Sequence, residues 1–254
     1  MPCYVCVTCG TQFLPTDVPP ARCDVCEDER QYVPSAGQRW TTLEALRTTH
    51  RCTIKRLERE LYGIGVEPRV GIGQRALLVR TPVGNVLWDC VPLIDDAMVD
   101  VICGLGGLVA IAISHPHFYT TMVEWARAFD VPVHLHAADR AWVMRPDRVI
   151  DYWDGETRPL VDGLTLVRCG GHFEGGTVLH WPAGAEGRGV LLTGDIIQLL
   201  PDARWVSFMR SYPNLIPLSR REIEGIGRAM ARFSVARVYG HYFDRVIAAD
   251  ATAV

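Results

Sequence analysis

The stretch LVAIAISHPH, residues 108–117, decides how the rest of the chain is organised. Its apolar part, Leu108 to Ile113, predicts a strand that is buried on both faces. A Thr-x-x-Glu capping box at residues 121–124 then predicts the start of a helix. His115 and His117 therefore lie in a short loop, and two residues apart in extended backbone they can point the same way. Such a loop can offer two imidazoles to one metal ion.

Three later segments add candidate metal ligands at strand ends or in glycine-rich turns. They are Gly170-Gly171-His172, Leu191-Leu192-Thr193-Gly194-Asp195 and Tyr239-Gly240-His241. Taken in this order, the four motifs resemble those of the metallo-β-lactamase fold superfamily, and the resemblance covers about Leu77 to Ile247. It implies an α/β fold, a four-layer αββα sandwich, and the activity of a metal-dependent hydrolase.

The sequence departs from this family at the first motif. The family pattern His-x-His-x-Asp-His continues here with Tyr119 and Thr120, whose side chains are poor zinc ligands. The resemblance implies a first metal site that keeps His115, His117 and His172, with Asp195 as a fourth ligand. A second site would keep only Asp195 and His241, so we expect one firmly held metal ion rather than two.

Two CxxC motifs near the N-terminus predict a second kind of metal site, built from Cys6, Cys9, Cys23 and Cys26. Two residues between thiolates let one tight turn present both sulfurs to a tetrahedral ion. The pair resembles a zinc ribbon or a rubredoxin-type knuckle, which implies a structural zinc, with an iron or partner-binding knuckle as the alternative. Cys3 is a rival ligand because Cys3 and Cys6 have the same spacing.

Composition and spacing suggest three parts. We expect a four-cysteine segment over residues 1–36, a helical connector over 37–68 with a capping box at Thr41 and a second helix through Leu57 and Leu61, and a metallo-β-lactamase-like domain over 69–254. The domain is long enough for a sizeable core, since 48% of the residues are hydrophobic.

The charge and the cysteine pattern bear on which partners the protein binds and on the cellular compartment in which we expect it. The net charge of -3 and the lack of a basic stripe do not suggest nucleic acid, and no apolar run approaches a membrane span. Nine cysteines, an odd number crowded near the N-terminus, fit metal binding in a reducing compartment, so we expect a cytoplasmic protein. A small-molecule substrate is expected, and the oligomeric state stays open.

Further residues are candidates for supporting roles around the metal. Asp89 ends a strand where the family has an acidic residue that orients a ligand histidine, although a simple turn is the alternative. His136 is either a similar support or a hydrogen-bonded core histidine. The aromatic side chains of the loop after Asp195 are candidates for lining an apolar substrate pocket; they are Trp205, Phe208 and Tyr212.

The implied chemistry is hydrolysis by a water that zinc activates near neutral pH. Asp195 acts either as the fourth ligand or as general base for that water. Tyr119 either donates a hydrogen bond or a proton to the substrate or only fills a gap in the core, and His241 carries a proton or holds substrate. The alternatives are a mononuclear iron oxidoreductase of the same fold and a non-catalytic protein that binds a partner through the cysteine segment.

Overall fold

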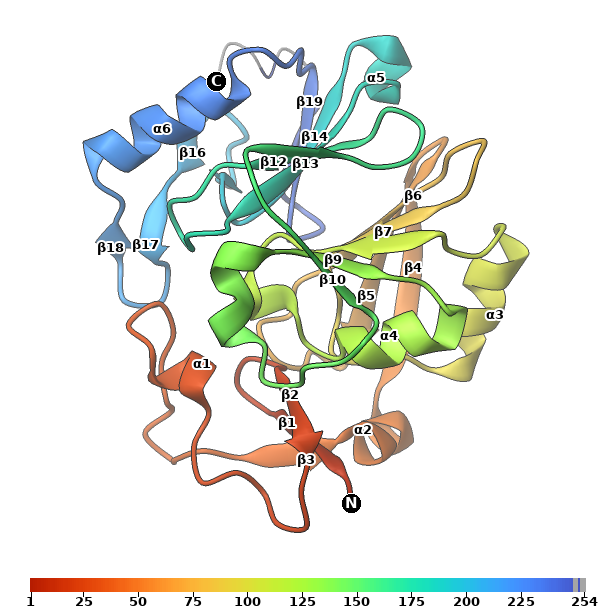
Figure 1. Ribbon diagram of the computed structural model, residues 1–254, viewed down its shortest axis with the longest axis vertical. Helices are drawn as coiled ribbons and strands as arrows, with labels where there is room; N and C mark the ends of the chain where they lie inside the picture. Colours follow the sequence, from red (N-terminus) through yellow and green to blue (C-terminus); the bar gives the residue numbers. More distant parts are fainter. Residues whose placement is uncertain (249–250, 252–254) are drawn as a thin grey trace.

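The structure, a computed structural model, describes residues 1–248 and 251 and is organised around two stacked β-sheets (Figure 1). The last part of the expected 69–254 domain, residues 249–250 and 252–254, lies outside the described residues. Within the described part of the chain, no helix is long and apolar enough to cross a membrane.

The first sheet has seven strands in the order β10-β9-β8-β7-β6-β5-β4. The strands β7 to β10 run parallel to one another, whereas β4 to β7 form an antiparallel meander. The bounds are β4 Arg51–Glu58, β5 Leu61–Glu67, β6 Ala76–Val79, β7 Val86–Trp88, β8 Ala110–Ala112, β9 Val133–His136 and β10 Ile150–Trp153.

The second sheet has six strands in the order β11-β12-β13-β14-β19-β20. Only the pair β14 and β19 is parallel, which places the ends of both strands at one edge of the sandwich. The bounds are β11 Thr157–Pro159, β12 Thr165–Arg168, β13 Thr177–Trp181, β14 Val190–Gly194, β19 Arg237–Gly240 and β20 Val246–Ile247.

Three hydrophobic cores separate the layers. Helices α3 (Asp96–Gly104) and α4 (Met122–Phe129) share a core with Leu78 on the outer face of the first sheet. Leu77 points the opposite way, into the core between the two sheets, as the alternation of side chains along a strand requires. Helix α6 (Arg220–Met230) packs on the outer face of the second sheet, against the third core. The expected αββα sandwich is confirmed.

The N-terminal cysteine segment forms its own small sheet below the sandwich (Figure 1). Its strands are β1 Cys3–Cys6, β2 Gln12–Pro15 and β3 Trp40–Thr42, followed by helix α2 Leu43–Thr49, with α1 Asp24–Glu27 between β2 and β3. Backbone hydrogen bonds join it to the main body: Gln12 donates to the Thr120 carbonyl at 3.2 Å and Leu14 to the Met144 carbonyl at 3.3 Å.

Short helices and strands in the loops complete the described chain. Their bounds are η1 Pro116–Phe118, η2 Ala137–Trp142, α5 Gly184–Gly187, β15 Gln198–Leu199, β16 Val206–Ser207, β17 Met209–Ser211 and β18 Ile216–Pro217. The last two strands form a hairpin that reaches toward α1 (Figure 1).

The helical connector expected over residues 37–68 is wrong for residues 51–67. Helix α2 forms, with Thr42 rather than Thr41 as its N-cap, but the following residues are the hairpin β4–β5 of the first sheet. The four-residue spacing of Leu57 and Leu61 imitates a helix, although the two residues belong to different strands. Gly63 is not a helix stop: a Cβ there would lie 2.7 Å from the ring of Phe243, so the strand needs a glycine where that ring covers it.

Candidate metal centres

Four predicted ligands come together at the edge of the sandwich. His115 and His117 lie in the turn between β8 and α4, His172 in the loop between β12 and β13, and Asp195 directly after β14. All four are buried, and one ligand atom of each lies within 4.8 Å of the others. Three separate loops thus build a metal-binding site from three imidazoles and one carboxylate.

Contacts of the Nδ1 atoms orient the rings of His172 and His115, so that the Nε2 atom of each points toward the other ligands. His172 donates from Nδ1 to the Met209 carbonyl at 3.0 Å, and His115 Nδ1 lies 2.9 Å from the Ser114 hydroxyl. The Nε2 atoms of both rings are then free for the cluster, where His115 Nε2 lies 3.1 Å from Asp195 Oδ1. His117 Nδ1 lies 3.2 Å from His172 Nε2. Metal-binding histidines are commonly oriented in this way.

Burial makes the group a good fit for a cation. Among the described residues, three buried atoms of the group have no hydrogen-bond partner: His115 Nε2, His117 Nε2 and Asp195 Oδ1. Burial lowers the pKa of His172 to about 4 and holds the pKa values of His115 and His117 well below their ordinary value, so these rings are neutral and keep lone pairs for a metal. Burial also raises the pKa of Asp195, which a bound cation would offset.

Asp89 supports this site through the backbone beside His115. Its Oδ1 accepts a hydrogen bond from the Ser114 amide at 2.8 Å, and its backbone is left-handed, with φ of 63°. Burial raises the pKa of Asp89 to about 7. Gly194 packs tightly here: a Cβ on it would lie 2.5 Å from Ser114 Oγ. Asp89 therefore holds the ligand loop by its main chain rather than by a histidine ring.

His241 lies beside the four ligands but is not one of the close group. It is buried and donates from Nδ1 to the Gly194 carbonyl at 3.1 Å, which leaves Nε2 as its free acceptor. The buried Arg75 fixes the same loop, because its guanidinium donates to the Gly240 carbonyl at 2.8 and 3.0 Å. Burial lowers the pKa of His241 to about 3. Sequence reasoning missed Arg75, since nothing in the local sequence marks its distant partner.

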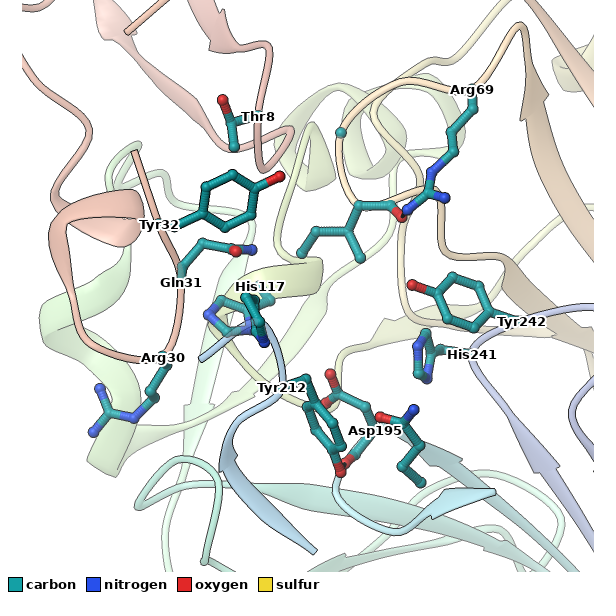
Figure 2. Close-up of a pocket in the computed structure, with 14 residues that line it drawn as sticks. Thr8, Arg30, Gln31, Tyr32, Arg69, His117, Asp195, Tyr212, His241 and Tyr242 are labelled. Atoms are coloured by element: carbon teal, nitrogen blue, oxygen red, sulfur yellow. Dashed lines mark hydrogen bonds between the residues drawn. The ribbon is translucent and has the colours of Figure 1, made fainter. Parts of the chain in front are cut away.

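A cavity of about 250 Å³ opens onto the centre, with the cysteine segment on one side and His241 and Tyr242 on the other (Figure 2). The lining residues are Thr8, Arg30, Gln31, Tyr32, Arg69, Gly71, Ile72, His117, Asp195, Gln198, Tyr212, Pro213, His241 and Tyr242. Tyr212 was among the expected lining aromatics, and its hydroxyl donates to the Asp195 carbonyl at 2.6 Å. The sequence did not predict that side chains of the N-terminal segment line the cavity.

The structure places four candidate residues away from the site: the core alternative holds for Tyr119 and His136, and the expected pocket role is wrong for Trp205 and Phe208. Tyr119 lies in the core under the first sheet, so its phenol fills space there and does not line the cavity. Trp205 is 64% exposed, and Phe208 lines a groove beside α6 instead. His136 is a core histidine: its Nδ1 accepts from the Ala138 amide at 3.2 Å and its Nε2 donates to the Gly155 carbonyl at 3.1 Å.

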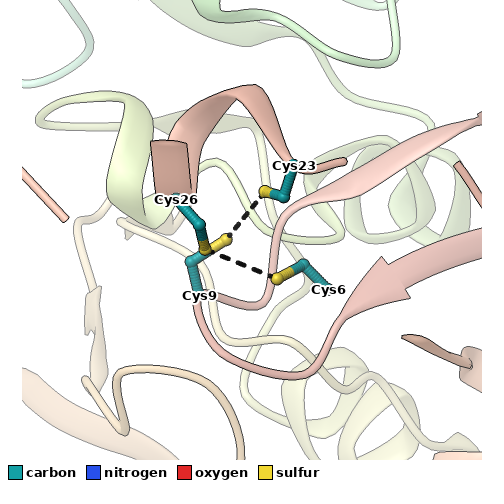
Figure 3. Close-up of side chains that lie close together, drawn as sticks. All are labelled: Cys6, Cys9, Cys23 and Cys26. Atoms are coloured by element: carbon teal, nitrogen blue, oxygen red, sulfur yellow. Dashed lines mark hydrogen bonds between the residues drawn. The ribbon is translucent and has the colours of Figure 1, made fainter. Parts of the chain in front are cut away.

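The four cysteines form the second buried cluster, shown in Figure 3. The sulfurs of Cys6 and Cys26 are 3.6 Å apart, as are those of Cys9 and Cys23, and all four cysteines are free of disulfides. Sulfurs about 2.3 Å from a tetrahedral ion lie about 3.8 Å apart, so the cluster fits such an ion. Cys3, the rival ligand, stands outside the group.

Gln38 adds a polar contact to the cysteine cluster that sequence reasoning did not foresee. Its Nε2 donates to the sulfur of Cys6 at 3.0 Å. A hydrogen bond to a thiolate stabilises its negative charge, so Gln38 supports a cluster of metal-binding thiolates from outside.

No family model matches the sequence. The chain is 49% identical over 253 residues to a Bacillus subtilis (strain 168) protein named uncharacterized protein YmaE, a match that covers 99% of this chain and 92% of that protein.

Solved metallo-β-lactamases share the architecture. The DIM-1 metallo-β-lactamase aligns with a TM-score of 0.60 at 16% identity, over 80% of this chain and 93% of that one. A B3 metallo-β-lactamase with an active-site glutamic acid aligns with a TM-score of 0.55 at 15% identity, over 79% of this chain and 84% of that one. The chain has the metallo-β-lactamase fold and belongs to the same family as Bacillus subtilis YmaE.

Proposed function

We propose that the protein is a metal-dependent hydrolase of a small molecule, with one zinc ion held by the imidazoles of His115, His117 and His172 beside the carboxylate of Asp195. The observation that carries the proposal is the buried cluster of three imidazoles and one carboxylate, of which His117 and Asp195 line a cavity. A zinc ion with three imidazole ligands, when bound, acts as a Lewis acid and makes water a nucleophile near neutral pH.

Three side chains around the histidine centre have separate roles in the proposed reaction. Asp195 offers a carboxylate with a second oxygen that can accept a proton from the attacking water. His241 is neutral because its pKa is about 3, so its Nε2 accepts a hydrogen bond from substrate or water. Tyr212 holds the Asp195 backbone in place through its hydroxyl.

The cavity favours an enzyme over a protein that only binds a partner. If the protein only bound a partner through its cysteine segment, nothing would explain why buried ligand atoms of the histidine centre lack hydrogen-bond partners. Such atoms destabilise a fold unless something binds them. The Cys6, Cys9, Cys23 and Cys26 cluster is proposed to hold a structural zinc, because closed four-cysteine sites favour that ion.

The experiment is a hydrolysis screen of the zinc-containing protein with carboxylic esters, thioesters and lactones. Turnover that is lost in His117→Ala and in the presence of a chelator, and kept in Tyr119→Phe, is the expected result. Iron as the resident metal at the histidine centre, with no hydrolysis of any substrate, would contradict the proposal and favour an oxidoreductase.

A further inference from the structure

One wall of the cavity comes from the cysteine segment. Thr8 and the run Arg30-Gln31-Tyr32 line the same space as His117 and Asp195, which belong to distant parts of the chain (Figure 2). The run begins four residues after Cys26, the last cysteine of the cluster. The cluster and the cavity are therefore joined by a very short stretch of backbone.

That stretch is held at both ends. On the segment side, the Gln31 amide donates to the Asp28 carbonyl at 3.0 Å. On the side of the β17–β18 hairpin, Asn214 Nδ2 donates to the Glu29 carbonyl at 2.8 Å and to the Gln31 carbonyl at 3.1 Å. An ion pair of 2.8 Å between Arg210 and Glu29 adds to this contact. The backbone of Gln31 is thus fixed against the main body before any ligand binds.

The side-chain amide oxygen of Gln31 has no hydrogen-bond partner among the described residues. Gln31 is 6% exposed, and its Oε1 is buried. Its neighbour Arg30 is held within the fold: Nη1 pairs with Asp28 at 2.8 Å and the guanidinium lies 4.4 Å from the centre of the Phe173 ring, although its Nε also has no partner among the described residues. Gln31 lines the cavity, and a buried amide oxygen that lacks a partner is unfavourable unless a donor reaches it, which a molecule bound in the cavity can supply.

We propose that Gln31 is a specificity-determining residue that accepts a hydrogen bond from an N–H or O–H group of a small polar substrate. The inference rests on the proposed function, since the reacting end of that substrate would lie at the histidine centre in the same cavity. The cysteine segment is then part of the substrate-binding site, and not only a stabilising appendage.

Thiols that bind the metal test this directly without a known substrate. The zinc-containing protein is titrated by calorimetry with mercaptoalcohols of two to four carbons between sulfur and oxygen, and with alkanethiols in which a methyl group replaces the hydroxyl. Each pair shares the thiolate and the size, so their difference reports the exchange of a hydroxyl for a methyl, and its loss in the Gln31 variant reports the contact with Gln31. We expect the mercaptoalcohol of one length to bind at least about fivefold more tightly than its alkanethiol.

The variants show which side chain causes that preference. Gln31→Leu keeps the size of the side chain and should lose the preference, while the exposed Glu27→Gln in the same segment should keep it. Metal content measured for each variant shows that both centres remain intact. An equal preference in wild type and Gln31→Leu, or none at any length, would overturn the inference and leave the proposed function standing. Binding of neither thiol would overturn both.

Discussion

The two metal-binding clusters of this chain are built in opposite ways. The cysteine cluster draws its ligands from the short span between Cys6 and Cys26, and its four buried sulfurs face one another. The histidine centre draws its ligands from His115 to Asp195, across both sheets, and borders a cavity. A closed site stabilises structure, whereas a site beside open space can act on a bound molecule.

The difference also concerns what holds each set of ligands. The cysteines lie at two tight turns of a small segment, so a bound metal would supply much of its folding energy. The histidines are held by Ser114, Met209 and the Asp89 carboxylate before a metal binds. Loss of the metal should therefore unfold the first site and leave the second in place.

The largest expected effect is that of Cys9→Ser. Bound zinc contributes roughly 10 kcal/mol to the folding of small four-ligand sites, so the variant should lose one metal ion and the order of residues 1–42. Metal stoichiometry and limited proteolysis measure both changes. Cys3→Ser is the matched control, because Cys3 stands outside the cluster. The comparison fails if Cys3→Ser loses the metal and Cys9→Ser keeps it.

A smaller effect concerns the loop that carries His172. Asp139 accepts a hydrogen bond from the Gly175 amide at 2.8 Å, and burial raises the pKa of this carboxyl from 3.8 to about 6. The folded state then binds the proton more tightly than the unfolded state, so this group lowers stability as the pH rises from about 4 to 6. The difference in pKa corresponds to about 3 kcal/mol.

Asp139→Asn should remove that pH dependence. The free energy of unfolding of the variant, relative to wild type, should increase by up to about 3 kcal/mol between pH 4 and pH 7. Urea denaturation at both pH values gives this difference. A relative stability that is the same at both values would show that the carboxyl does not titrate in this range.

Asp89→Ala should weaken the histidine centre without unfolding it. The Ser114 amide loses its acceptor, and supporting contacts of this kind change metal affinity by about 10- to 100-fold. Competition with a chelator measures the affinity. Asp89→Asn keeps an acceptor oxygen and tolerates the left-handed backbone, so its affinity should stay closer to wild type. Equal losses in both variants would point to the charge of Asp89 instead.

The smallest expected effect is that of Tyr119→Phe. Because the phenol lies in the core and not in the cavity, hydrolysis rates and metal content should change by less than about twofold. Steady-state kinetics on a substrate from the screen measure the rates. A tenfold loss of kcat at full metal content would show that Tyr119 takes part in the reaction.

Strand ends made the metal ligands predictable from the sequence. His115, His117, His172 and Asp195 each follow a recognisable apolar run or glycine turn, and the αββα layers arrange those ends together. The direction of Tyr119 was not predictable, because it depends on the short turn η1 and on the positive φ of 39° at Thr120.

The wall of the cavity was also beyond sequence reasoning. Asn214, far along the chain, helps to fix the backbone of Gln31 beside the cavity. The hairpin β4–β5 was misread because Leu57 and Leu61 copy helical spacing, and its glycines make sense only under the ring of Phe243. Such long-range contacts leave no local pattern in the sequence.

Metal analysis by mass spectrometry tests the central claim most directly. The protein is purified without added metal, together with His117→Ala and Cys9→Ser. The account predicts two zinc ions per chain in wild type and one in each variant, with normal folding of His117→Ala. A single metal ion that survives in His117→Ala and disappears in Cys9→Ser would contradict it, because the histidine centre would then hold no metal.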